Sequence, residues 1–198
     1  MAAATRGRPR TFDRAAALDA ATRLFWERGY HATSLGDLTA AMGIRPGSLY
    51  KAFGDKQSLF REVVDSYSAT PNAAFVRRAL DETSTARAAF DRILHDAARI
   101  YADPAHPPGC LIITAATNVT GQDAEIEAFL RDIRNANLRT FRDRFDTAGK
   151  QGELAPDADP AALANFFAVV IQGMSQRARD GATVDDLRRV ADLAMKTL

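Results

Sequence analysis

Apolar residues recur at the spacing of an α-helix along almost the whole chain, and no other feature restricts the fold as much. Residues three or four positions apart share one face of a helix, so such a series marks an amphipathic helix. Two series show this best, one made of Ala17, Leu18, Ala21, Leu24 and Phe25 and the other of Ala164, Phe167, Ala168, Ile171 and Met174. No segment has a convincing strand pattern. The sequence therefore predicts an all-α fold.

Helix start and stop signals divide this periodic sequence into segments. Asp13 is a typical N-cap, Ser34 and Asp37 have the spacing of a capping box, and Gly43 is typical of a helix end. Pro71 is expected to end or kink the helix before it. The expected helices cover about residues 14–28, 34–42, 46–53, 56–67, 84–102, 108–119, 123–149, 160–179 and 184–197.

Charge and helix boundaries suggest three parts of the chain. We expect a flexible basic arm at residues 1–10, a three-helix head at 11–62 and a helical body at 63–198. Up to residue 62 there are ten Lys or Arg against six Asp or Glu, a net charge of +4. The remainder has sixteen against nineteen, a net charge of −3, and the two parts together give the +1 of the whole chain. A basic head favours contact with a polyanion.

Composition argues against several classes of protein. No apolar run approaches the roughly 18 residues of a membrane span, and no signal-peptide core is present, so we expect a cytoplasmic protein. The single cysteine, Cys110, cannot form an intrachain disulfide. His31, His95 and His106 are scattered, and no catalytic triad or phosphate-binding glycine loop occurs. We predict no metal, no cofactor and no enzymatic activity.

The head has the pattern of a helix-turn-helix. Three helices fall within the first 53 residues, and a glycine turn joins the short second and third helices. The motifs there are Phe25-Trp26-Glu27-Arg28-Gly29-Tyr30, Thr33-Ser34-Leu35, Gly47-Ser48-Leu49-Tyr50-Lys51-Ala52-Phe53-Gly54-Asp55-Lys56 and Leu59-Phe60. In order and spacing, residues 10–62 resemble the signature of the tetracycline-repressor (TetR) family of bacterial regulators. The resemblance implies a dimeric regulator of transcription, most often a repressor that a small molecule releases from a palindromic DNA operator.

The third helix, which starts at Pro46, is expected to lie in the major groove of DNA. Arg45, Ser48 and Lys51 and the bare backbone of Gly47 fall where they can approach the groove floor. Arg and Lys side chains read the O6 and N7 atoms of guanine there. We therefore expect these positions to select the DNA sequence.

The resemblance also implies phosphate contacts in the head. It assigns Thr33, Ser34, Tyr50 and Lys56 to the DNA backbone, through hydroxyl or ammonium donors. A structural role stands beside these contacts, because Ser34 would cap a helix in any protein and Tyr50 would equally cover the small core. Many family members have histidine where this chain has Ala52, so the operators of relatives do not transfer to it.

The basic arm has the sequence Arg6-Gly7-Arg8-Pro9-Arg10. Arginine-rich arms enter narrow, A·T-rich minor grooves, and we expect Arg8 and Arg10 to extend the DNA footprint in this way. A solubilising tail without DNA contact is the alternative. Deletion of residues 1–10 separates the two, because loss of phosphate contacts lessens the salt dependence of binding.

The body is expected to form the dimer. One head contacts only a few base pairs, whereas a two-fold dimer places two recognition helices about 34 Å apart along the duplex. The resemblance puts the interface on the helices near 123–149 and 160–179. The second of these has a broad apolar face made of Phe166, Phe167, Val170, Ile171 and Met174. Burial of that face within the monomer is the alternative.

The resemblance places a small-molecule ligand of unknown identity among the middle helices of the body. The candidate contacts form a mainly apolar set with a few polar groups, namely Phe90, Leu94, Tyr101, Cys110, Ile113, Thr114, Thr117 and Asn118. Most of them fit an ordinary core position equally well. Ligand binding is expected to shift the helix that starts at Lys56 and so to change the separation of the two heads.

Two other hypotheses stay open at this point. Cys110 follows Gly109 near an expected helix start, where a stabilised thiolate would make the protein a redox sensor. The alternative for this cysteine is a small buried hydrophobic residue. The other hypothesis is an enzyme or carrier that uses a helical pocket and keeps a vestigial head, and it lacks a convergent pair of catalytic groups.

Overall fold

The computed structural model describes residues 12–117 and 120–198, and over these ranges it contains helices and no strand, which confirms the predicted fold class. The helices are α1 (Arg14–Arg28), α2 (Leu35–Met42), α3 (Pro46–Phe53), α4 (Lys56–Ser68), α5 (Phe75–Glu82), α6 (Ala86–Tyr101), α7 (Leu111–Thr114), α8 (Ala124–Lys150), α9 (Pro160–Arg179) and α10 (Val184–Ala194). Two short 3-10 helices, η1 (Gly121–Asp123) and η2 (Met195–Thr197), complete the regular structure.

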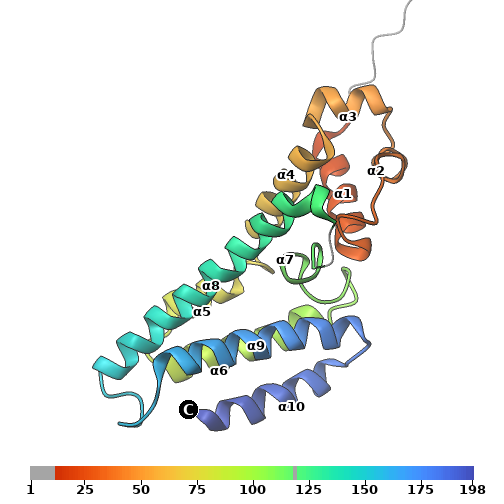
Figure 1. Cartoon of the computed structure of the whole chain (residues 1–198). Helices are drawn as coiled ribbons and strands as arrows, with labels where there is room; N and C mark the ends of the chain where they lie inside the picture. Colours follow the sequence, from red (N-terminus) through yellow and green to blue (C-terminus); the bar gives the residue numbers. More distant parts are fainter. Residues whose placement is uncertain (1–11, 118–119) are drawn as a thin grey trace, which may run out of the picture.

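The molecule is elongated, with the head at one end and the body at the other (Figure 1). α1, α2 and α3 lie at the head end, and α6, α9 and α10 pack together at the far end. α4 leads from the head toward the body, and the long α8 runs from the head to the opposite corner of the molecule. These two helices therefore connect the head with the body.

Side chains cap the starts of several helices, as predicted for Asp13 and for Ser34 with Asp37. Asp13 caps α1 by accepting hydrogen bonds from two backbone N–H groups. Ser34 and Asp37 form a reciprocal capping box at the start of α2, and Thr183 and Asp186 form a second one at the start of α10. Such side chains satisfy N–H groups that have no partner inside the helix. Local sequence therefore fixes where these helices begin.

Two hydrophobic clusters stabilise the two ends. In the head cluster, the ring of Phe60 lies 4.9 Å from the rings of Phe25 and Tyr30, centre to centre. In the body cluster, Phe90 stacks on Phe145 at 4.3 Å. Buried residues of α7 and of the first turns of α8 belong to the head cluster. The head is therefore completed by segments that lie far along the chain.

The sequence patterns predicted no helix between α4 and α6, and that prediction was wrong. α5 occupies Phe75–Glu82, with Phe75 and Ala79 buried one helical turn apart. The residue before it, Ala74, makes no side-chain capping hydrogen bond. Without a capping signal, the helix start was not visible in the sequence, and packing against the body cluster holds the segment instead.

The helix expected at 108–119 was wrong in length, because α7 covers only Leu111–Thr114. Gly109 has a φ of +81°, and a Cβ built on it would lie 2.7 Å from the carbonyl oxygen of Ser175. This close approach to α9 holds the chain before α7 out of a helical conformation. After α7, the carbonyl oxygen of Ala115 accepts a hydrogen bond of 2.7 Å from the head loop that follows α1. Contacts with α9 before α7, and with the head after it, therefore take the place of the additional helical turns that were expected.

Candidate DNA interface and ligand cavity

α2 and α3 form the expected helix-turn-helix. α2 ends at Gly43, whose φ of 65° and ψ of 29° lie in the left-handed region that glycine adopts without strain. Leu38 of α2 and Leu49 of α3 are fully buried, so they fix how α3 packs on the head. At the other end of α3, the guanidinium of Arg14 donates a 3.3 Å hydrogen bond to the carbonyl oxygen of Ala52. α3 is therefore held at both ends.

The outer edge of α3 carries the residues predicted to read bases. Arg45, Pro46, Gly47 and Lys51 are exposed, and Ser48 is half-buried. A Cβ built on Gly47 would meet nothing within 4 Å, so the backbone is open to approach there. Within the described ranges, neither Arg45 nor Lys51 forms an ion pair. This edge offers unpaired cations beside bare backbone, as base readout in a major groove requires.

Three of the residues predicted to hold phosphates surround this edge. The Tyr50 side chain is 52% exposed, and Ser34 is exposed at the start of α2, where its hydroxyl also caps the helix. Lys56 is half-buried, with Nζ 4.2 Å from the centre of the Tyr30 ring. Burial lowers the pKa of Lys56, and nearby Asp123 partly opposes this shift. These groups can face a DNA backbone, and their phosphate contacts stay a prediction.

Thr33 lies differently from the other predicted phosphate contacts. Its side chain is fully buried, and its hydroxyl donates a 2.7 Å hydrogen bond to the carbonyl oxygen of Gly29. The backbone N–H of Thr33 donates to the carbonyl oxygen of Tyr30. In this geometry the side chain stabilises the turn between α1 and α2 and does not face solvent.

Arg8 and Arg10 of the basic arm lie outside the described residues, as does Asn118 of the ligand candidates. Their contacts stay predictions.

Backbone carbonyl groups of the head are bound by the body. The guanidinium of Arg179, in the last turn of α9, donates to the carbonyl oxygens of Trp26 at 3.0 Å and Glu27 at 3.2 Å. These carbonyls belong to the last turn of α1, where no helical partner is available. The N–H of Tyr30 binds the carbonyl oxygen of Ala115, just after α7. The end of α1 is thus anchored to two elements of the body.

The start of α8 is also tied to the head. Nδ1 of His31 lies 2.8 Å from Oδ2 of Asp123, and the Gln57 amide donates a 2.8 Å hydrogen bond to Glu125. These contacts join Asp123, just before α8, to the loop before α2, and Glu125, in the first turn of α8, to the first turn of α4. The start of α8 is therefore coupled to the head at two points.

The predicted ligand contacts differ widely in exposure, from fully buried core positions to exposed ones. Phe90 and Leu94 are fully buried, Tyr101 is nearly so, and Thr117 is exposed. Ile113 lines a hollow between α8 and α9. Contact of these residues with a ligand stays a prediction.

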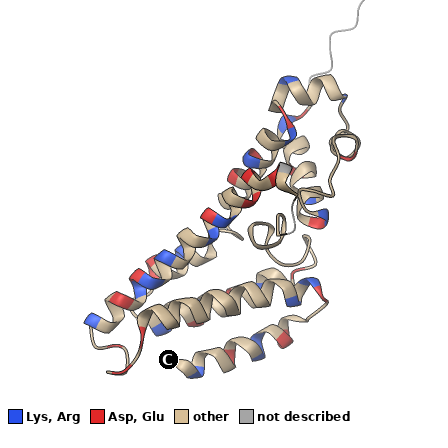
Figure 2. Ribbon diagram, in the orientation of Figure 1, with Lys and Arg blue, Asp and Glu red and all other residues tan. Residues whose placement is uncertain are grey.

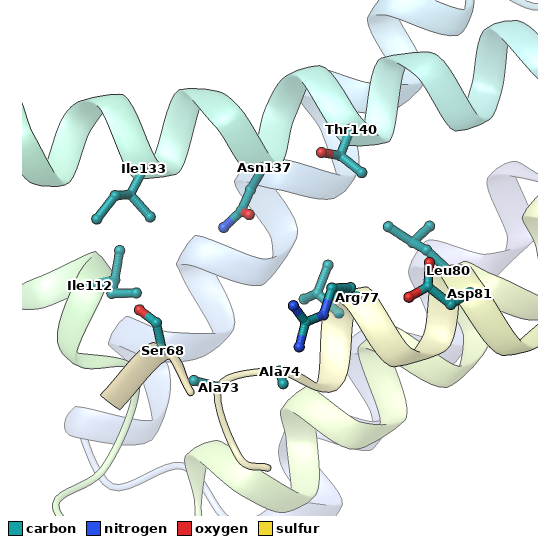
Figure 3. A pocket seen from close by; sticks show the side chains of 11 residues that line it. Ser68, Ala73, Ala74, Arg77, Leu80, Asp81, Ile112, Ile133, Asn137 and Thr140 are labelled. Carbon is teal, nitrogen blue, oxygen red and sulfur yellow. The ribbon is translucent and has the colours of Figure 1, made fainter. Parts of the chain in front are cut away.

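A cavity of about 390 Å³ lies between α5 and α8, with the end of α4 and α7 beside it (Figure 3). The side chains that face one another across it are Arg77, Leu80 and Asp81 from α5 and Ile133, Asn137 and Thr140 from α8. None of these residues was among the predicted ligand contacts. α5 was not expected, and the helix near 123–149 was assigned to the dimer interface. The sequence feature that could have indicated this wall is the pair Asn137 and Thr140, two uncharged polar residues at i, i+3 spacing among charged ones.

Cys110 is partly buried beside Tyr67, whose hydroxyl donates to its sulfur at 3.5 Å. Burial raises the pKa of the Cys110 thiol, although the hydrogen bond from Tyr67 opposes the shift. The carbonyl oxygen of Cys110 accepts a 2.9 Å hydrogen bond from the Thr114 hydroxyl. Because the thiolate is the form that oxidants attack, a raised pKa disfavours the redox-sensor hypothesis.

Within residues 12–117 and 120–198, no group of three or more His, Cys, Asp or Glu side chains is placed to hold a metal ion. No helix there combines the length and the apolar character needed to cross a bilayer.

Comparison with known proteins agrees with this architecture. Residues 17–63 match the family described as bacterial regulatory proteins, tetR family, and residues 86–193 match the tetracyclin repressor-like C-terminal domain. The HTH-type transcriptional repressor ComR of Escherichia coli (strain K12) is 34% identical over 192 residues, which cover 97% of this chain and 91% of ComR. The uncharacterized HTH-type transcriptional regulator YezE of Bacillus subtilis (strain 168) is 31% identical over 193 residues, with 97% and 99% covered.

A solved structure is similar over nearly the whole chain. It is a cysteine variant of the TetR family transcriptional regulator CifR, complexed with 26-bp double-strand operator DNA. The two chains are 38% identical, with a TM-score of 0.89 and coverage of 96% of this chain and 98% of that one.

Proposed function

The chain belongs to the TetR family of bacterial regulatory proteins, and on that premise we propose that it is a dimeric repressor that leaves a palindromic DNA operator when a small molecule binds its body. The outer edge of α3 carries this proposal. Arg45, Gly47 and Lys51 are exposed there on a helix that the head core holds rigidly. ComR is named a transcriptional repressor and CifR was solved on operator DNA, which supports the same activity here.

Each exposed group of the head has a distinct role in this proposal. Arg45, Ser48 and Lys51 read base edges, and Gly47 lets the backbone approach the groove. Tyr50 and Lys56 hold phosphates, which set the register of the head on the duplex without selecting sequence. The family is one of transcription regulators, and the absence of catalytic activity stays a prediction.

The outer face of α9 forms the core of the dimer interface. The expectation that Phe167, Ile171 and Met174 belong to this face was wrong, because all three are buried in the body cluster of the monomer. Phe166 is 39% exposed and Val169 is 67% exposed, one helical turn apart. One turn further on, Gly173 has open space where a Cβ would stand, so a second helix can approach closely. In Figure 2, charged residues interleave along α8, whereas most of α9 lacks them. Exposed apolar faces on a helix mark surfaces that a partner covers, and a second copy of α9 would cover this one.

A ligand in the cavity reaches the head through α4 and α8. Ser68, the last residue of α4, lines the cavity, while Lys56 begins the same helix next to the head. α8 forms the opposite wall, and its start binds His31 and Gln57. A ligand lowers operator occupancy only if it prefers the conformation that does not fit DNA. Displacement of either helix changes the separation of the two α3 helices in the dimer.

Selection of bound duplexes from a random DNA library, at two salt concentrations, tests this function. The wild type should recover a palindrome. Lys51→Ala should alter the base preference at symmetric positions, because a side chain that reads a base edge is lost. Lys150→Ala, at the end of α8 far from the head (Figure 1), is the matched control and should recover the wild-type site. If no palindrome is enriched, the proposal fails and a pocket protein with a vestigial head is favoured.

A further inference from the structure

The cavity between α5 and α8 has chemically different ends (Figure 3). At one end, Ile112 of α7 and Ile133 of α8 face each other. At the other, Arg77 extends from α5 toward the space below α8, where Asn137 and Thr140 stand on the facing wall. An occupant that satisfies both ends must have an apolar part and a polar part.

The polar end holds one cationic and one anionic side chain among the residues that line the cavity. Within the described ranges, Arg77 makes no ion pair and its side chain donates no hydrogen bond to a protein acceptor. Asp81, one turn further along α5, also lines the cavity and forms no ion pair there. Arg134 of α8 lines the hollow that adjoins the cavity at Val76 and Asn137. Arg77 and Asp81 are therefore the two charged side chains of the cavity lining, and Arg134 lies outside it.

The two guanidinium groups differ in how they are used. Arg134 is half-buried, and its Nη1 donates a 2.9 Å hydrogen bond to the carbonyl oxygen of Ile112, so it holds α7 against α8. Arg77 has no such structural bond, and its planar donors match the two oxygens of a carboxylate. Asn137 lies across the cavity, where its amide can donate to the same group.

We propose that this cavity binds an amphipathic carboxylate, with the carboxylate on Arg77 and Asn137 and an aliphatic part between Ile112 and Ile133. The proposal rests on the proposed function in that this acid would be the effector that releases DNA. The cavity volume of about 390 Å³ suits a chain of several carbon atoms. Arg77 is exposed, so beside a neutral molecule of the same shape its guanidinium would be bound by water alone.

Isothermal titration of the full-length protein with octanoate and with 1-octanol tests the proposal. The wild type should bind octanoate at least about tenfold more tightly than 1-octanol, because hydrogen bonds to charged groups are the strong ones. Arg77→Gln should remove this preference, and Arg77→Lys, which keeps the charge but loses the planar fork, should keep part of it. Arg139→Gln, at an exposed position of α8 outside the cavity lining, should bind as the wild type does.

Three results would overturn the proposal. They are equal binding of octanoate and 1-octanol, an unchanged octanoate affinity in Arg77→Gln, and the absence of octanoate binding by a wild type whose thermal unfolding is cooperative. Binding of the selected palindrome, measured without any probe on the same samples, tests the proposed function separately. A wild type that binds octanoate through Arg77 but no palindrome would contradict the repressor and leave the carboxylate site standing.

Discussion

The head and the body are built from the same kind of helix but are specified in different ways. In the head, short helices begin at side-chain caps such as Asp13, Ser34 and Asp55, each of which accepts hydrogen bonds from backbone N–H groups. In the body, α5 and α8 begin without a side-chain cap. Stacked rings such as Phe90 and Phe145 hold the body together across distant parts of the chain. Side chains also cap α6, α9 and α10, so the difference lies in α5 and α8, the two cavity walls, which packing places without a local cap.

This difference matches the tasks of the two regions. A surface that reads DNA must present the same side chains at a fixed geometry, and local capping with a small core provides that rigidity. A body that responds to a ligand must hold a cavity and transmit a displacement, and long helices shared by two clusters do so. The predictions below test whether the two regions can be perturbed separately.

The largest expected effect is on the body core. Phe90→Ala should lower the free energy of unfolding by about 3–5 kcal/mol, the range for a buried phenylalanine. Phe90 is fully buried and contacts three other rings, so the cavity left behind cannot close easily. Chemical denaturation measures the change. Leu193→Ala, at a side chain that is 66% exposed, is the control and should change it little. A loss below about 1 kcal/mol for Phe90→Ala would show that packing around this ring does not hold the body.

The second effect tests whether DNA binding by the head requires dimerisation through the body. Val169→Arg places a charge at the centre of the exposed face of α9, and the dimer should dissociate because an unpaired charge is costly in an apolar interface. Palindrome affinity should fall about a hundredfold, or 2.7 kcal/mol. Val190→Arg, at a valine of α10 that is 42% exposed, should remain a dimer. Sedimentation and fluorescence anisotropy give the two readouts, and a dimeric, fully binding Val169→Arg protein would remove α9 from the interface.

The third effect compares equivalent caps in the two regions. Ser34→Ala and Thr183→Ala each break a reciprocal capping box, so each should cost about 1 kcal/mol of stability. Only Ser34→Ala should also weaken operator binding, because Ser34 is predicted to contact phosphate. Thermal unfolding and anisotropy on the same samples separate the two losses. Equal operator affinity for both variants would mean that Ser34 is a cap and nothing more.

The smallest effect is a pH dependence. Hydrogen bonds from Thr183, with a smaller contribution from Arg189, lower the pKa of Asp186 to about 2 from its ordinary value near 4. A carboxyl group whose folded pKa is depressed stabilises the fold above its unfolded pKa, and this contribution is lost as the pH falls from about 4 toward 2. The denaturation midpoint of the wild type should therefore fall more steeply over that range than that of Asp186→Asn. Parallel curves would show that the capping carboxylate does not titrate with folding.

The head could be predicted well from its sequence because its signals are local. Ser34 with Asp37 and the glycine at position 43 mark α2 within a few residues of their own positions. The exposure of Arg45 and Lys51 then follows from the faces that Leu38 and Leu49 must bury. Thr33 shows the limit of this approach, because its burial depends on how the α1–α2 turn folds back on Gly29.

The cavity could not be predicted because its walls come together only in three dimensions. Arg77 lies on a helix without a capping signal, and Asn137 lies among charges typical of a solvated face. The length of α7 depends on the approach of Gly109 to Ser175, which are far apart in the sequence. No periodicity or spacing in the sequence links Arg77 with Asn137, or Gly109 with Ser175. Such contacts decide which apolar residues line a cavity and which fill the core.

If two copies of the α3 edge, held by one dimer, read a palindrome, both half-sites must contribute to affinity. This is measured as the affinity of the full-length protein for the selected duplex, with both half-sites intact or with one scrambled. Scrambling one half-site should weaken binding at least about a hundredfold, since mismatched base pairs cost about 1–3 kcal/mol each. Equal affinity for the two duplexes at the same salt concentration would contradict the requirement for both half-sites.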